Sequence, residues 1–254
     1  MAEKKYDVKR ALREQKKIKM KGNLYHLTQV SFAYNSNHIE GSRLTQEQTR
    51  MIFETNTILP NQGEAIRYND IIETHNHFRL FDYMLDHCDD ELDTDLMKKF
   101  HEILKNGSND AELEWFRVGD WKLLPNIIGD HTETVAPEDV EKVMTKLLNE
   151  YHAKKKIEFE DIVDFHYRFE SIHGFQDGNG RVGRMIMFKE CLKHDIVPFI
   201  IEDIHKSFYY RGLKEYSSEK GYLMDTCLNS QDRYMALYDE LVGNLYQKKD
   251  EIER

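Results

Sequence analysis

Apolar side chains recur every three or four residues along most of the chain, which is the spacing expected when one face of a helix is buried. Stretches with this period lie at 66–88, 92–104, 137–154, 160–172, 182–194, about 207–220 and about 230–249. Strict alternation of apolar and polar residues, the sign of a half-buried strand, is rare. The pattern therefore predicts an all-α helical bundle.

The first part of the chain adds shorter helical segments. Residues 1–22 are rich in lysine and are expected to form a solvated entry segment that can become helical. Residues 24–40 are aromatic and polar, and the glycine that follows, Gly41, is a common helix C-terminal cap because it accepts a left-handed backbone. Residues 44–56 form another predicted helix, which the Thr45 side chain would cap.

One segment does not follow the helical period. Residues 116–137 contain two glycines, two prolines and short runs of leucine, isoleucine and valine, which indicates a small β-hairpin with a loop. A lone hairpin is marginally stable and must pack on the helices. Its free edge could pair with an added peptide strand. A plain connecting loop explains this segment equally well.

Composition and charge narrow the possible functions. The net charge of −10 argues against a nucleic-acid-binding protein, which usually presents a basic face. The N-terminus lacks the apolar core of a signal peptide, and no apolar run reaches the roughly 20 residues that cross a bilayer. The cysteines Cys88, Cys191 and Cys227 are far apart and indicate neither a disulfide framework nor a zinc site. We therefore expect a cytoplasmic protein without a nucleic-acid or membrane partner.

The most informative segment is SIHGFQDGNGRVGR, residues 171–184. Its glycines tolerate positive φ, so successive backbone N–H groups can point into one concavity. A helix is predicted to follow, and the unpaired amides at a helix N-terminus favour an anion there. Arg181 and Arg184 can add guanidinium donors that match phosphate oxygens. The segment therefore predicts a phosphate-binding site.

Two further residues of this segment predict chemistry as well as binding. Asp177 would be repelled by a phosphate unless a cation lay between them, and Mg²⁺ is the natural cation because it takes one or two carboxylates together with phosphate oxygens. His173 can take a proton from an attacking hydroxyl near neutral pH. Other histidines, namely His75, His77, His101 and His194, lack partners at metal-ligand spacing and are expected to be structural.

The segment HGFQDGNGRVGR resembles the signature of the Fic (filamentation induced by cAMP) family, HxFx(D/E)GNGRxxR, at every defined position. The resemblance extends over about residues 66–220. It implies a Fic-fold helical bundle and a nucleotidyltransferase that moves AMP from ATP to a Ser, Thr or Tyr hydroxyl of a protein and releases pyrophosphate. It also implies that residues 61–254 form the catalytic domain with its C-terminal helices.

The resemblance further implies a role for each matching residue. His173 would deprotonate the target hydroxyl, and Asp177 would hold Mg²⁺ against the α- and β-phosphates. Arg181 would grip the β-phosphate region and Arg184 the γ-phosphate. The residues that would line the anion hole are Gly178, Asn179 and Gly180. Many family members have proline after the histidine, whereas this chain has Gly174, which is expected to loosen the backbone beside the base.

Residues that would contact the rest of the nucleotide are also implied. Tyr209 and Tyr210 match a tyrosine pair that we place near the adenine and ribose, although two core tyrosines on a helix remain an alternative. Ser217 stands where some members have asparagine, so the base preference stays open. In the hairpin, which corresponds to the family's target-docking flap, the residues nearest the ligand would be Asn126, Ile127 and Ile128.

A second stretch, SNHIEG at residues 36–41, resembles the family's inhibitory motif (S/T)xxxE(G/N). It lies in the N-terminal helical segment, residues 1–60. In a helix, Ser36 and Glu40 share a face, and Glu40 would pair with Arg184. Like-charge repulsion of a phosphate at about 4 Å is on the order of 4 kcal/mol at an effective dielectric near 20. We therefore expect a self-inhibited adenylyltransferase.

The expected partners are ATP and a protein hydroxyl docked along the hairpin, with self-modification and a possible homodimer. Alternatives remain open. Within the family these are an enzyme that removes AMP with water, or a transferase of another nucleotide or phosphate group. The alternative from another functional class is a non-catalytic interaction module that senses ATP. A DNA-binding regulator is disfavoured by the acidic composition and by the short chain after residue 220.

Overall fold

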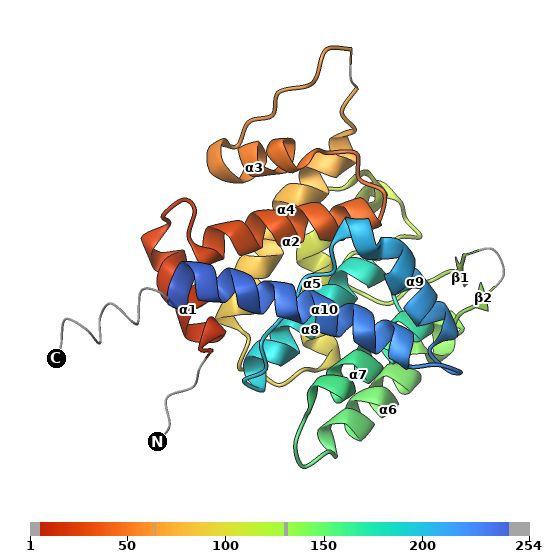
Figure 1. Ribbon diagram of the computed structural model, residues 1–254. Coiled ribbons are helices and arrows are strands. Elements are labelled where there is room, and N and C mark those ends of the chain that lie inside the picture. The colour runs from red at the N-terminus through yellow and green to blue at the C-terminus, as the bar shows by residue number, and fades with distance from the viewer. Residues whose placement is uncertain (1–5, 64, 130–131, 244–254) are drawn as a thin grey trace.

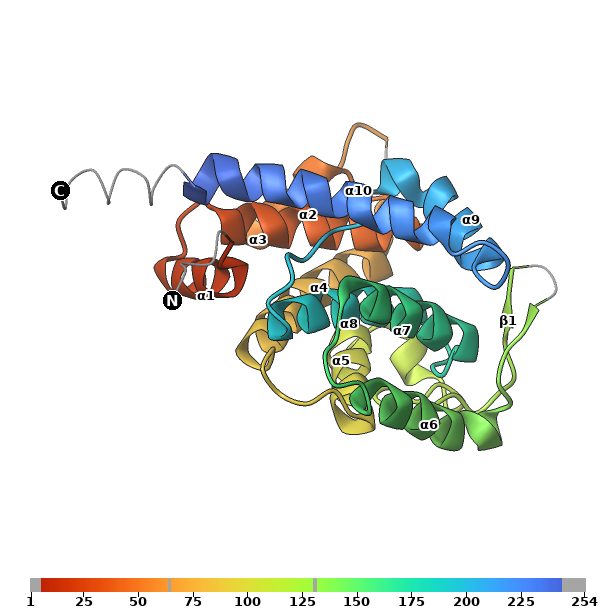
Figure 2. The same cartoon turned by 60° about the horizontal axis from the view of Figure 1, so that its bottom comes forward.

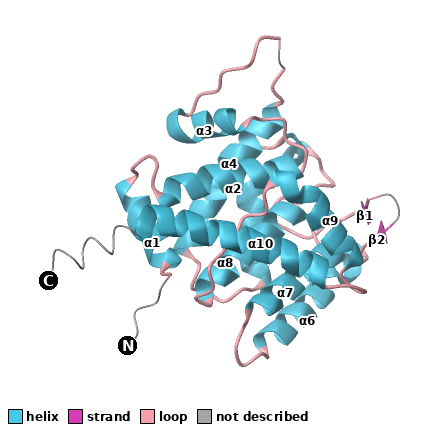
Figure 3. Cartoon of the chain, viewed as in Figure 1, coloured by secondary structure: helices cyan, strands magenta, loops and turns pink. Residues whose placement is uncertain are grey.

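The computed structural model describes all residues except 1–5, 64, 130–131 and 244–254, and leaves the side chain of residue 132 undescribed. Helices dominate the described residues, as the apolar period predicted (Figures 1 and 3). The α-helices are α1 (Val8–Ile18), α2 (Leu24–Ile39), α3 (Gln46–Thr55), α4 (Tyr68–Asp86), α5 (Thr94–Lys105), α6 (Val140–His152), α7 (Phe159–Ile172), α8 (Asn179–Lys193), α9 (Lys206–Glu215) and α10 (Gly221–Tyr238). Shorter turns are η1 (Asn109–Glu112), η2 (Pro137–Asp139), η3 (Asp203–His205) and the π-helical η4 (Asp239–Gly243).

Helix α8 lies at the centre of the bundle and contacts α2, α4, α5 and α7 (Figure 2). Every residue from 181 to 192 is buried. A helix that is covered all round does not need one apolar face, so its charged residues are buried too and must find partners inside the protein. The functional residues of this helix are therefore held by several neighbouring elements.

The N-terminal segment shares the core of the remainder of the chain. Leu12, Leu24 and Phe32 belong to the same buried cluster as Phe81 and Phe188. The lysine-rich start forms α1, and α2 packs on α1, α3, α4 and α8. The described part of residues 1–60 thus packs on the helices that follow, and its helix α2 lies against the central α8.

The small hairpin that the sequence indicated is present, and each of its strands is two residues long. Its strands, β1 (Ile127–Ile128) and β2 (Thr132–Glu133), pair antiparallel with Ile127 opposite Glu133. The other described residues of 116–137 are irregular apart from η2, which begins at Pro137. The hairpin extends away from the helices between α6 and α9 (Figure 2). Such short strands cannot form a stable sheet alone, so side chains at their base must hold them.

Several helix boundaries in the structure differ from those predicted. Helix α8 begins at Asn179 and not at residue 182, because Gly178, with φ of 82°, caps its start. The helix expected at 230–249 starts earlier, at Gly221, and residues 244–249 lie outside the described part of the chain. Thr45 caps α3 and forms a capping box with Gln48, as its position predicted. Among the described helices, none is long and apolar enough to cross a membrane.

Candidate active site

The loop between α7 and α8 carries the signature residues and is fixed from within. The Asn179 side chain accepts a hydrogen bond from the Phe175 N–H at 2.8 Å and donates one to the Phe175 carbonyl oxygen at 2.8 Å. Asn179 is buried, and its side chain closes the loop through these two hydrogen bonds. Its backbone still belongs to the first turn of α8.

Phe175 holds this loop against α5. Its ring is fully buried and stacks on the His101 ring, with centroids 4.1 Å apart and planes 6° from parallel. His101 Nδ1 accepts from the Gly119 N–H at 2.9 Å, so its Nε2–H is free to donate to the Asp177 carbonyl oxygen at 3.2 Å. Burial lowers the pKa of His101 to about 3, which keeps this neutral tautomer. The structural role expected for His101 is thus the support of the signature loop.

The N-terminus of α8 has amide donors that no described side chain caps. Among the described residues, no side chain caps its first turn, so amide donors remain available there. Gly180 lies in this turn, and a Cβ atom on it would come within 2.2 Å of Glu40 Oε1. The Glu40 carboxylate therefore already lies over the bare backbone of Gly180, at the position where an anion is favoured.

Arg184 is the main partner of Glu40. Its Nη2 donates to Glu40 Oε1 at 2.7 Å and to the Ser36 carbonyl oxygen at 2.9 Å, while its Nε donates to Ser36 Oγ at 3.1 Å. Burial opposes the charge of Arg184, but Glu40 outweighs it and raises the pKa of the guanidinium above its usual value. Arg184 Nη1 is buried without a hydrogen-bond partner among the described residues. One donor of this arginine thus remains for a ligand.

The turn after α2 brings Glu40 to this position. Helix α2 ends at Ile39, and Gly41 follows with φ of 90°. The Gly41 N–H donates to the His38 carbonyl oxygen and the Ser42 N–H to that of Asn37, each at 3.0 Å. Gly41 therefore ends the helix in the left-handed conformation that the sequence predicted, and Glu40 projects from the last turn toward α8.

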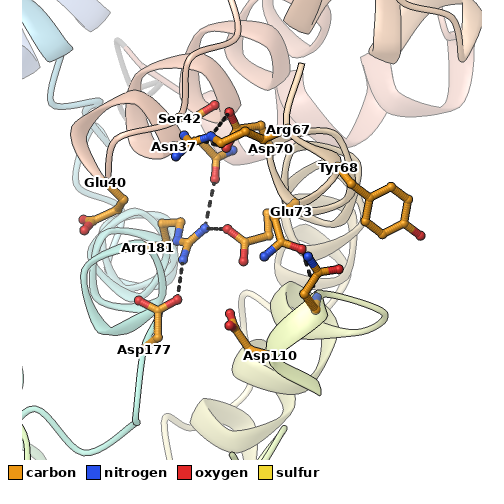
Figure 4. Close-up of a pocket in the computed structure, with 12 residues that line it drawn as sticks. Asn37, Glu40, Ser42, Arg67, Tyr68, Asp70, Glu73, Asp110, Asp177 and Arg181 are labelled. Carbon is orange, nitrogen blue, oxygen red and sulfur yellow. Dashed lines mark hydrogen bonds and ion pairs between the residues drawn. The ribbon is translucent and has the colours of Figure 1, made fainter. Parts of the chain in front are cut away.

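Arg181 lies in a second set of charges, one turn before Arg184 (Figure 4). It pairs with Glu73 of α4, and its Nη2 lies 3.1 Å from Asp177 Oδ2. Asn37 of α2 accepts a longer bond from Nη1 at 3.4 Å. Arg181 is buried, and Glu73 and Asp177 raise the pKa of its guanidinium despite the opposing effect of burial.

Lys105 of α5 belongs to the same set of charges as Arg181, Glu73 and Asp177. Its side chain is fully buried, and its ammonium contacts Asp177 at 2.8 Å, Asp110 at 2.6 Å and Glu73. Burial works against the charge of Asp177, but Arg181 and Lys105 prevail and hold the pKa of its carboxyl well below its usual range. Asp177 is therefore ionised at neutral pH, and its side chain remains 51% exposed.

These charges border a cavity of about 500 Å³ between α2, α4, η1 and the start of α8 (Figure 4). Oxygen atoms of Glu73, Asp110 and Asp177 lie within 4.8 Å of one another, and the Lys105 ammonium contacts all three carboxylates. The residues that line the cavity are Asn37, Glu40, Ser42, Arg67, Tyr68, Asn69, Asp70, Glu73, Asn109, Asp110, Asp177 and Arg181.

His173 ends α7 in the left-handed conformation, with φ of 52°. Its Nδ1 lies 3.3 Å from the Glu170 carbonyl oxygen, which favours a proton on Nδ1 and leaves Nε2 as the basic nitrogen. Burial lowers the pKa of His173, and the nearby Lys122 ammonium lowers it further, while Glu40 and Asp177 raise it. The net effect is an imidazole that is neutral at physiological pH.

The residues expected near the nucleoside and the flap differ in exposure. Tyr209 is buried, and its hydroxyl lies 2.6 Å from His166 Nε2, so it has almost no surface for a ligand and matches the core-tyrosine alternative. Tyr210 is 44% exposed and donates to the Ile39 carbonyl oxygen at 3.0 Å. In the hairpin, Ile127 and Ile128 are exposed, whereas the Asn126 amide donates to the Phe175 carbonyl oxygen at 3.0 Å.

Sequence analysis did not identify several residues of this site, namely Asn37, Glu73, Lys105, Asp110 and Lys122. The spacing of His101 and Lys105, four residues apart on one face of α5, was the one local signal. The other contacts join residues that are distant in the chain, such as Lys105 and Asp177, and they become visible only in the folded structure.

Comparison with known proteins agrees with the signature. Residues 91–191 match the Fic/DOC family. The chain is 27% identical over 186 residues to protein adenylyltransferase Fic from Nematostella vectensis, covering 72% of this chain and 42% of that protein. It is 25% identical over 191 residues to protein adenylyltransferase fic-1 from Caenorhabditis elegans, covering 73% and 36%. The chain thus spans less than half the length of these relatives.

Solved structures share the fold. A Fic domain containing signaling protein from Bacteroides thetaiotaomicron superimposes with a TM-score of 0.74 at 20% identity, covering 92% of this chain and 97% of that one. A fragment of Fic-1 from C. elegans gives a TM-score of 0.66 at 18% identity, covering 94% and 72%. The family match over residues 91–191, together with the complete signature at residues 173–184, identifies this part of the chain as a Fic domain.

Proposed function

We propose that this protein transfers AMP from ATP to a hydroxyl of a protein, and that Glu40 holds it inactive by occupying the phosphate site. The observation that carries this proposal is the position of the Glu40 carboxylate, 2.7 Å from Arg184 and over the bare backbone of Gly180 at the mouth of α8. Relatives named protein adenylyltransferase support the reaction class.

Binding of the triphosphate would use the donors gathered at α8. The first-turn amides and Arg184 Nη1, which lies 3.0 Å from the position of a Cβ atom on Gly180 and has no partner among the described residues, would hold phosphate oxygens. Arg181 adds positive charge one turn earlier. Asp177 would hold Mg²⁺, and the half-exposed, ionised carboxylate fits this role. When bound, Mg²⁺ neutralises phosphate charge.

The chemical step requires a base beside the α-phosphate. The hydroxyl oxygen attacks the α-phosphorus, the bond from this phosphorus to the bridging oxygen breaks, and pyrophosphate leaves. His173 Nε2 takes the hydroxyl proton. Its lowered pKa keeps the imidazole unprotonated and able to accept that proton at neutral pH.

Inhibition follows from electrostatics. The Glu40–Arg184 pair occupies the arginine that would hold the terminal phosphate and places a carboxylate where further negative charge must enter. The repulsion at about 4 Å is on the order of 4 kcal/mol when the effective dielectric is near 20. ATP would then bind with its phosphates displaced from the alignment that in-line attack needs.

The test compares label transfer from α-labelled ATP and Mg²⁺ in the native protein and in Glu40→Gly. We expect the variant to label itself or added lysate proteins much more strongly, and Glu40→Gly/His173→Ala to lose this label. Glu40→Gln, which keeps the side-chain size but removes the charge, should also raise transfer. Equal labelling of Glu40→Gly and native protein would refute the inhibitory role, and the mass of the adduct would identify AMP or another group.

A further inference from the structure

Lys122 is a buried cation that the mechanism above does not use. It is 2% exposed and lies in the irregular segment between α5 and the hairpin. In the described part of the chain, its ammonium donates to Asn126 Oδ1 and Thr134 Oγ1, each at 2.6 Å, and both acceptors are neutral. Burial lowers its pKa to about 8. Burying an ammonium group without a carboxylate partner costs free energy, so we expect Lys122 to have a structural or functional role here.

The partners of Lys122 lie at the base of the hairpin. Asn126 directly precedes β1, and Thr134 directly follows β2. The Thr134 hydroxyl also lies 2.6 Å from Asn126 Oδ1 and 2.9 Å from the Asn126 carbonyl oxygen. Lys122 therefore joins the two arms of the hairpin where they leave the protein body, which two-residue strands require because their own pairing is weak.

The same residues join the hairpin to the signature loop. The Lys122 N–H donates to the Gly174 carbonyl oxygen at 2.9 Å, and the Asn126 amide donates to the Phe175 carbonyl oxygen at 3.0 Å. Gly174 and Phe175 directly follow His173. The residues where the hairpin leaves the protein body are thus hydrogen-bonded to the backbone next to His173, the proposed general base. Any rotation of the hairpin would break these hydrogen bonds.

We infer that Lys122 is a positioning residue that sets the hairpin, and with it a docked target segment, at a fixed orientation relative to His173. This inference rests on the proposed function, because it assumes that the target hydroxyl reaches His173 along the hairpin. In-line transfer is sensitive to displacement, and a shift of about 1 Å can cost on the order of 100-fold in rate.

The charge of Lys122 gives a second readout. The charged groups near His173 are Lys122, which lowers its pKa, and Glu40 and Asp177, which raise it. Removing the ammonium therefore raises the pKa of His173. In the Glu40→Gly background, which lacks one of these carboxylates, the acid limb of the rate–pH profile should move to higher pH when Lys122 is replaced.

The experiment uses full-length Glu40→Gly as parent and adds Lys122→Met, which keeps most of the side-chain volume. We expect AMP transfer to fall about 10- to 100-fold while the affinity for a non-hydrolysable ATP analogue stays within about two-fold, because the phosphate site is untouched. Hydrogen exchange in peptides covering 122–128 should accelerate.

Lys122→Arg should restore part of the transfer. Thr134→Val, which removes one acceptor, should reproduce the faster exchange, and Lys146→Met, at an exposed lysine of α6, should change none of these quantities.

AMP transfer by Glu40→Gly/Lys122→Met at the level of the Glu40→Gly parent, unchanged exchange at 122–128, or a parallel loss of nucleotide affinity would each overturn the inference. Its failure is distinguishable from failure of the proposed function. If the Glu40→Gly parent transfers no AMP, the proposed function fails. Hydrogen exchange in Lys122→Met and Thr134→Val then still decides whether Lys122 fixes the hairpin to the signature loop.

Discussion

The ring of Trp121 occupies the space beside Gly174 in which a side chain would lie. A Cβ atom on Gly174 would come within 3.1 Å of Trp121 Cε3 and within 3.1 Å of Val140 Cγ1. The sequence predicted that glycine at this position, where many relatives have proline, loosens the backbone next to His173. In the structure Gly174 is buried against this aromatic ring, so there is little space for a side chain at this position.

Gly174→Ala should therefore destabilise the protein by about 1–3 kcal/mol, the usual cost of adding volume to a packed core. Urea unfolding measures this change as a lower midpoint with an unchanged slope. Trp121→Phe in the Gly174→Ala background should recover part of the loss, because the smaller ring leaves room for the methyl group. If Gly174→Ala were as stable as the native protein, the packing account would be wrong.

Lys105 should contribute strongly to stability. Lys105→Met leaves Glu73, Asp110 and Asp177 without their shared ammonium, although Arg181 still pairs with Glu73 and Asp177. Removing one member of a buried ion pair costs about 3–5 kcal/mol, and the partial exposure of these carboxylates should bring the cost toward the lower end.

The matched control is Lys99→Met on the same helix, whose exposed pair with Glu102 at 2.9 Å should be worth less than about 1 kcal/mol. Both variants are compared by urea unfolding at neutral pH. A similar free energy of unfolding for the two variants would contradict the buried charge set.

Glu170 should make stability depend on pH. Its carboxyl is buried beside α8, and burial raises its pKa to about 8 despite the attraction of Arg184. The folded protein therefore holds this proton more tightly than the unfolded chain does. The resulting stabilisation is fully present below the unfolded pKa of about 4.3 and is lost as the pH rises toward 8.

Glu170→Gln keeps the shape of the neutral acid and removes its titration. We expect the free energy of unfolding of this variant to fall less between pH 5 and 8 than that of the native protein, by about 1 kcal/mol or more. Glu160→Gln, at the first turn of the same helix, serves as the control. Parallel pH profiles for native protein and Glu170→Gln would show that Glu170 is ionised in the fold.

Local features of the sequence predicted much of this protein. The apolar period gave the helical class, Thr45 and Gly41 marked helix ends, and the residues of the signature indicated an anion site at the start of a helix. These features depend on residues close in the chain, because caps, positive φ angles and first-turn amides are set by neighbours. The small hairpin was also indicated, but a plain connecting loop remained an equal alternative, because pairing of such short strands depends on tertiary support.

The sequence by itself determined the family signature, the mainly helical architecture and the turn that leads into α8. Only the tertiary structure decided which charges meet: Lys105 with Asp177, Arg181 with Glu73, and Lys122 with the base of the hairpin. It also decided that Asn179 closes the loop and that Tyr209 is buried. The physical reason is that burial forces each charge or polar group to find a partner, and that partner is supplied by whichever distant element packs there.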